Sequence, residues 1–124
     1  MKSLIVVAGV IACATSAQAE AWTCSYILDG SKEPVLHRFE LSPPDLIETR
    51  YNEHYRVLQN NGYGLVATEA ISGIEEGQQK ATVGAHTVVI NKETGEFRWH
   101  MLITGTSADY DALNTPVKGK CIKG

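Results

Sequence analysis

The chain has 124 residues, of which 11 are Lys or Arg and 14 are Asp or Glu, so its net charge is −3 with neutral histidines. This length is enough for one domain with a single core but not for two. A mildly acidic chain lacks the basic surface of nucleic-acid-binding proteins, so we expect no nucleic-acid partner.

Residues 1 to 19 have the three parts of a secretory signal peptide, namely a basic start, an apolar run and an Ala-Gln-Ala cleavage sequence. The apolar run is shorter than the roughly 20 residues that span a bilayer. We therefore predict cleavage between Ala19 and Glu20, a periplasmic or secreted location, and no stable membrane insertion after cleavage. The alternative is a lipid anchor through Cys13, because the sequence Val-Ile-Ala-Cys that ends there resembles a bacterial lipobox.

Two cysteines remain once the leader and Cys13 are removed. They are Cys24, near the start of the exported chain, and Cys121, near its end. An even number of cysteines in an oxidising compartment is typical of disulfide-bonded proteins. The sequence therefore predicts a disulfide between Cys24 and Cys121 that closes almost all of residues 20 to 124.

The exported part begins with two segments in which apolar and polar residues alternate, as in half-buried strands. The first is "WTCSYIL" at 22 to 28 and the second is "VLHRFEL" at 35 to 41, and turn-forming residues separate them. The alternation places His37 on the apolar face of the second segment. Pro43-Pro44 then ends this segment, because proline has no backbone N–H to donate to a sheet.

Residues 42 to 61 are compatible with two structures. Ser42 could cap a helix in which Tyr51 and Tyr55 fall at helical spacing. Alternation around Tyr55 favours a strand instead, and Asn61-Gly62 could supply the two positive-φ residues of a tight hairpin turn. We favour a hairpin of residues 54–60 with 63–71, and a helix over 43–59 remains the alternative.

The most regular segment is "TVVINKETGEFRWHM" at 87 to 101, which follows a polar connection at 72 to 80. It predicts a hairpin with Gly95 in the left-handed conformation of the turn. The period of two places Phe97, Trp99 and Met101 on the inner face. Arg98 and His100 then lie on the opposite face, where they form a possible binding face.

A loop over 105 to 116 and a last strand, "VKGKCI" at 117 to 122, complete the chain. These elements predict an all-β domain of about seven or eight strands. The expected architecture is a small antiparallel meander, closed into a barrel or packed as a sandwich, with its ends joined by the disulfide.

No pattern in the chain is typical of a catalytic, cofactor-binding or metal-binding site. The four histidines are not spaced so that two imidazoles would lie side by side: His37, His54, His86 and His100. We expect His37 and His86 to be partly buried and hydrogen-bonded. The acidic pairs Glu75-Glu76 and Asp109/Asp111 fall in predicted loops. We therefore assign no catalytic residue, no cofactor and no metal ligand.

Several pieces of the exported chain resemble small exported bacterial proteins of unassigned function: "WTCSY", "YRVLQNNGYGLVA", "TVVINKETGEF" and "GKC". The start "WTCSY" is also distantly similar to the periplasmic inhibitors of C-type lysozyme, which are small β-barrels that begin near a Tyr/Trp-x-Cys sequence. That resemblance implies a barrel with inhibitor-like action. The chain has no counterpart of the Ser/Gly-rich inhibitory loop, so no inhibitory residue is transferred to it.

These observations favour a non-enzymatic exported domain that binds a protein or a small ligand, with inhibitor-like action as one form. A lipocalin-like carrier of an apolar ligand is the first alternative, because a small barrel can hold a ligand when side chains do not fill it. A small hydrolase is the second alternative.

Overall fold

The computed structural model describes residues 20–28, 30–74, 81–104 and 116–124. The predicted leader with Cys13, the acidic pairs Glu75-Glu76 and Asp109/Asp111, and most of the predicted loop at 105 to 116 lie outside these ranges. The strands are β1 Ala21–Ile27, β2 Pro34–Ser42, β3 Asp45–Glu48, β4 Glu53–Asn60, β5 Gly64–Gly73, β6 Thr82–Asn91, β7 Glu96–Thr104 and β8 Val117–Lys123.

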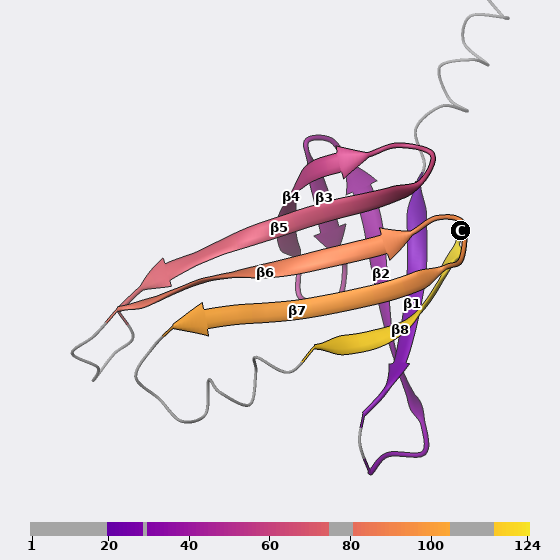
Figure 1. The fold of residues 1–124 in the computed structure, drawn as a ribbon, viewed down its shortest axis with the longest axis horizontal. Coiled ribbons are helices and arrows are strands. Elements are labelled where there is room, and N and C mark those ends of the chain that lie inside the picture. The colour runs from indigo at the N-terminus through magenta and orange to yellow at the C-terminus, as the bar shows by residue number, and fades with distance from the viewer. Residues whose placement is uncertain (1–19, 29, 75–80, 105–115) are drawn as a thin grey trace, which may run out of the picture.

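Each strand pairs antiparallel with the next one, and β8 returns to β1, so the meander closes into a barrel (Figure 1). This confirms the predicted all-β fold. Among the described residues no segment is a helix long and apolar enough to cross a membrane. Residues 45–48 and 53–60 are strands, so the hairpin interpretation of this region is confirmed and the helix is wrong.

The turn between β4 and β5 differs from the predicted type. Asn60 pairs with Leu65, with four residues between them, and neither Asn61 nor Gly62 is among the residues with positive φ. The Asn61 side chain shapes the loop instead, because its Oδ1 accepts the backbone N–H groups of Tyr63 at 2.9 Å and Gly64 at 3.1 Å. An asparagine that bonds to the backbone ahead of it replaces the tight two-residue turn.

Alternation along each strand places one row of side chains inside the barrel. The inner row of β7 contains Phe97, which is fully buried, and Trp99, which is 9% exposed, whereas Arg98 on the other face is exposed. This confirms the predicted orientation of the strand. Phe39 packs against both Phe97 and Trp99, with ring centroids 5.8 Å and 5.6 Å apart. Aromatic rings therefore occupy the interior that a lipocalin-like carrier would need for its ligand.

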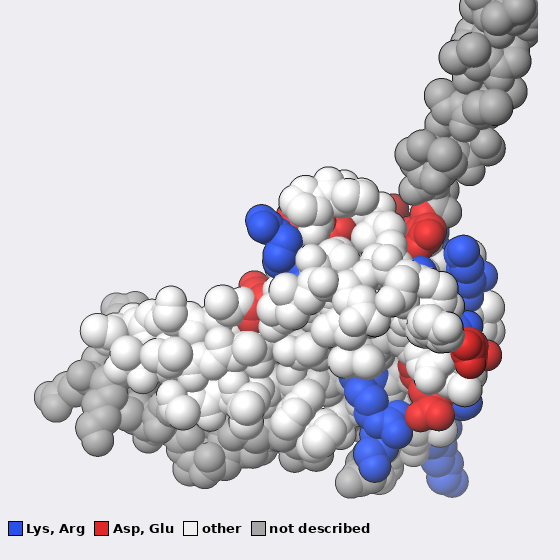
Figure 2. Space-filling view, turned by 45° about the horizontal axis from the view of Figure 1, so that its top comes forward, with Lys and Arg blue, Asp and Glu red and all other residues white. Residues whose placement is uncertain are grey.

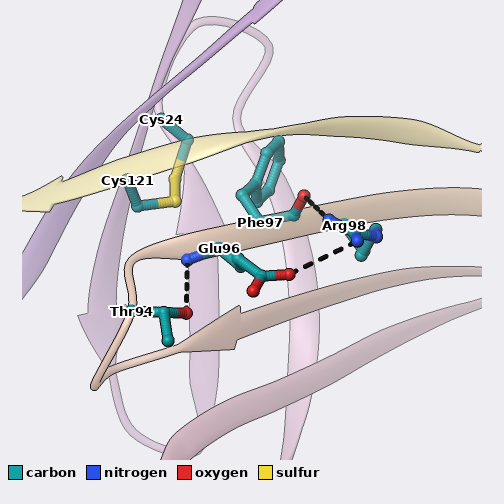
Figure 3. Close-up of a disulfide and its surroundings, with 6 residues drawn as sticks. All are labelled: Cys24, Thr94, Glu96, Phe97, Arg98 and Cys121. Carbon is teal, nitrogen blue, oxygen red and sulfur yellow. Dashed lines mark hydrogen bonds and ion pairs between the residues drawn. A yellow bond between two sulfur atoms is a disulfide. The ribbon is translucent and has the colours of Figure 1, made fainter.

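The hairpin between β6 and β7 lies beside the disulfide that joins β1 to β8 (Figure 3). Gly95 has a φ of 79°, as predicted. A Cβ at this position would lie 2.9 Å from the Cys121 carbonyl oxygen, so both the conformation and the close approach require glycine. Cys24 and Cys121 are register partners in the β1–β8 pair, and their disulfide confirms the predicted link between the chain ends.

Three strands continue beyond the barrel. β5 pairs with β4 only as far as Thr68, and β7 pairs with β8 only as far as Trp99. β5, β6 and β7 remain paired with one another past these points. We call the continuation the arm, which comprises residues 69–73, 82–87 and 100–104. It projects from the barrel in Figure 1.

Candidate functional site

Trp99 lies between two histidines at the end of the barrel where the arm begins. The His86 ring stacks on it with centroids 4.8 Å apart and an interplanar angle of 2°. The His37 ring meets it edge-on, with centroids 4.7 Å apart and an angle of 77°. The three residues belong to β6, β7 and β2, and all occupy inward positions, so closure of the barrel brings them together.

The first histidine belongs to a buried hydrogen-bonded chain. His37 is 5% exposed and Glu48 is fully buried. Glu48 Oε2 accepts from His37 Nδ1 at 3.0 Å, and its Oε1 accepts the backbone N–H of Tyr51 at 2.8 Å. When Nδ1 of His37 carries the proton that Glu48 accepts, Nε2 accepts the Tyr26 hydroxyl, which lies at 3.1 Å. Both oxygens of the buried carboxylate are thereby satisfied.

Glu48, His37 and Tyr26 form the sequence carboxylate, imidazole, hydroxyl. The same sequence of groups occurs in catalytic triads, where the hydroxyl is the nucleophile. A tyrosine here occupies the place of the nucleophile. Burial raises the pKa of Tyr26, although the positive charge of Arg50 opposes the shift. A hydroxyl held more firmly in its protonated form is a weaker nucleophile, so the arrangement favours a structural role for His37 and Glu48.

We expect Glu48→Ala to lower the free energy of unfolding by about 3 kcal/mol, because it leaves His37 and the Tyr51 N–H without a buried acceptor. Urea unfolding followed by fluorescence measures the effect. Glu40→Ala is the matched control: Glu40 is a neighbouring acid, and the 52% exposure of its side chain predicts a change within about 0.5 kcal/mol. A loss below 1 kcal/mol in Glu48→Ala would contradict the structural role.

The second histidine belongs to a cluster that carries two carboxylates. The Tyr55 hydroxyl donates to Glu53 Oε2 at 2.7 Å and lies 3.1 Å from His86 Nδ1. Glu69 is the register partner of His86 on the adjacent strand. One carboxylate oxygen each of Glu53 and Glu69 and one nitrogen of His86 lie within 4.8 Å of one another.

The protonation equilibria of this cluster reflect its burial. Burial lowers the pKa of His86, while the negative charge of Glu53 opposes the shift. Burial raises the pKa of Glu69, and the negative charge of Glu53 raises it further. Burial also raises the pKa of Tyr55, which stays protonated as a hydrogen-bond donor to Glu53. A neutral imidazole therefore lies beside two acidic groups that repel one another.

The sequence did not reveal this convergence. The three residues belong to three different strands: Glu53 to β4, Glu69 to β5 and His86 to β6. Only the pairing register of these strands brings their side chains together. From the sequence we assigned no metal ligand and did not group these three residues. The expectation that His37 and His86 are partly buried and hydrogen-bonded is confirmed. His54, by contrast, lies on the outside of the barrel and bonds to Asp45 at 3.2 Å.

The predicted binding face on β7 is separate from this cluster. Arg98 points outward and forms an exposed ion pair with Glu96 at 3.3 Å, as Figure 3 shows. His100 is the register partner of Thr87 on the same outward face. Both residues therefore occupy the opposite face of β7 from Trp99, although His100 is near enough to His86 to contribute to the lowering of its pKa. A binding role for them remains a prediction.

The chain matches no protein-family model, and no curated protein or solved structure shows significant similarity to it.

Proposed function

We propose that the protein is an exported, non-enzymatic binding protein that attaches to a partner protein through the arm. The observation that carries this proposal is the composition of the arm. Beyond Glu69, His86 and His100, no charged or histidine residue occurs in the described parts of the arm and its flanks, 70–74, 81–85 and 101–104. In Figure 2 the described residues of the projecting part show almost no Lys, Arg, Asp or Glu on the visible face.

The surface of the arm is apolar in several places. Exposed fractions reach 53% for Val83 and 64% for Leu102 in the arm, and 68% for Ile74, which directly follows β5. Two small uncharged residues, Ala70 and Ser72, are exposed on the neighbouring strand β5. Soluble proteins usually interrupt such surfaces with charges, and a continuous uncharged patch is typical of a protein–protein contact.

The arm also has an edge that could accept another strand. Residues 69–73 of β5 pair with β6, and no described strand pairs with them on their other side. Exposed strand edges are usually protected by charged side chains or by proline. An edge on which residues 70–73 are uncharged fits an extended segment of a partner protein that adds a strand to the sheet. Inhibitor-like action is compatible with this mode of binding, in which the arm binds an extended segment of the partner protein.

Export is supported by two independent features. The Cys24–Cys121 disulfide is compatible with an oxidising compartment, and the first 19 residues have the pattern of a leader. The non-enzymatic assignment is supported by the Tyr26 arrangement, whose hydroxyl is held in its protonated form. The ring packing inside the barrel favours partner binding at the surface over transport of an apolar ligand.

The test combines photocrosslinking and hydrogen exchange in a periplasmic extract of the producing cell. A photoreactive side chain at Ser72 should crosslink to one partner protein, and the bound form should protect the amides of residues 69–73. Ala70→Lys should abolish both signals because it places a charge on the arm. Glu40→Lys, on the barrel wall, should leave them unchanged.

Two results would overturn the proposal. A crosslink that persists in Ala70→Lys would place the contact elsewhere, and failure to crosslink any protein would remove the partner. A crosslink between two copies of the chain, with a dimeric mass in solution, would identify the edge as a self-association surface instead. Circular dichroism of Ala70→Lys should remain sheet-like, which separates loss of binding from loss of folding.

A further inference from the structure

We infer that Glu53, Glu69 and His86 form a binding site for a divalent transition-metal ion, with Zn²⁺ as the best match. One possible ligand atom from each residue lies within 4.8 Å of the other two. The site goes beyond the partner-binding role of the arm and does not depend on it. All three side chains are partly exposed, so an ion from solution can reach them.

The types of ligand determine which ion fits. Zn²⁺ accepts imidazole nitrogen and carboxylate oxygen at about 2.0 to 2.2 Å, and three protein ligands leave a fourth position for water. Ca²⁺ takes six to eight oxygen ligands, and Mg²⁺ prefers an octahedral shell of oxygen atoms. One imidazole and two carboxylates therefore favour a transition metal over either of these ions.

Tyr55 holds two of the three ligands in place. Its hydroxyl is 2.7 Å from Glu53 Oε2 and 3.1 Å from His86 Nδ1, and the Tyr55 side chain is itself fully buried. Groups that orient metal ligands in this manner strengthen metal binding, and their removal commonly weakens it by about 10- to 100-fold. The buried Tyr55 therefore fixes the positions of the Glu53 and His86 side chains.

The two carboxylates of the cluster have only histidines as possible cationic neighbours, namely His86 beside Glu53 and His54 near Glu69. Glu53 lies 3.8 Å from His86 Nδ1, and neither Glu53 nor Glu69 forms an ion pair with Lys or Arg in the described part of the chain. The imidazole of His86 has two ring nitrogens, so it can offer one to a metal while Nδ1 bonds to Tyr55. A divalent cation would relieve the repulsion between the two carboxylates.

The position of the site suggests what the ion would do for the structure. The last register pair between β4 and β5 is Arg56 with Thr68. Glu53 stands on β4 beyond that pair, and Glu69 is the first residue of the arm. An ion held by both would connect the barrel to the base of the arm where backbone pairing ends.

The test is calorimetric titration of Zn²⁺ into untagged, chelator-treated protein at pH 7. We expect binding of one ion and a higher melting temperature. Glu69→Gln keeps the shape of the side chain and should weaken binding by at least about 10-fold, and Tyr55→Phe by about 10-fold. His54→Gln is the control, because His54 is a solvent-exposed histidine that bonds to Asp45 and affects Glu69 only electrostatically, so its removal should change the affinity far less than Glu69→Gln does.

The pH dependence provides a second readout. Affinity should fall between pH 7 and pH 5, because the ligands must lose their protons to bind the ion. The inference is overturned if Zn²⁺ does not bind, if Glu69→Gln binds as tightly as the unmodified chain, or if His54→Gln weakens binding equally. Glu69→Gln is the decisive variant, since the Glu69 side chain has no hydrogen bond or ion pair in the described structure and its replacement should leave folding intact.

Discussion

Trp99→Ala is expected to lower the free energy of unfolding by about 3 to 5 kcal/mol, the range for removal of a large buried aromatic side chain. The indole is the common neighbour of His37, His86 and Phe39, with ring centroids 4.7 Å, 4.8 Å and 5.6 Å away. Its removal would leave a cavity lined by these rings, which belong to β2 and β6. Urea unfolding followed by circular dichroism measures the loss.

Arg98→Ala is the matched control for this substitution. Arg98 precedes Trp99 on the same strand but faces outward, and its ion pair with Glu96 is exposed. We expect a change within about 0.5 kcal/mol. A nearly neutral Trp99→Ala together with a severe Arg98→Ala would mean that β7 faces the other way, which would contradict the register of the barrel.

Removal of the disulfide by joint replacement of Cys24 and Cys121 with serine is expected to destabilise the protein by about 4 to 5 kcal/mol. The bond joins residues 97 positions apart, and the entropy of the unfolded chain rises with the length of the loop that is opened. The melting temperature of the double variant should be markedly lower, as thermal unfolding by circular dichroism would show.

A reducing agent provides the control for the disulfide. It should lower the melting temperature of the unmodified protein toward that of the double serine variant, and it should have no effect on the variant itself. Equal stability with and without the bond would show that pairing between β1 and β8 holds the ends together unaided. It would also imply that the unfolded chain keeps its ends close.

Residues 35–41 and 97–103 show why the sequence was sufficient for most of the fold. Inner and outer positions alternate there without interruption, so only one face of each strand can turn toward the core. His37 and Trp99 were therefore placed correctly on the inside and Arg98 on the outside. The cysteine pair was equally clear, because residues 20–124 contain no other cysteine.

Residues 43–59 show where local pattern was insufficient. Apolar residues there fit both a helical and a strand period, and the turn at Asn61 was predicted with the wrong geometry. The register between β4 and β5 also shifts between Val57 and Gln59, a bulge that the local pattern did not show. The choice of strand depends on contacts made elsewhere in the chain, since Leu46 and Tyr55 are fully buried only in the closed barrel.

The cluster around Trp99 depends on tertiary structure alone. Glu53, Glu69 and His86 meet because three neighbouring strands are paired in one particular register, and His37 joins them through closure of the barrel. The alternation of residues determines which face a side chain occupies, and this information is local. Which side chains meet across strands depends on turn geometry, bulges and closure, and these are properties of the whole sheet.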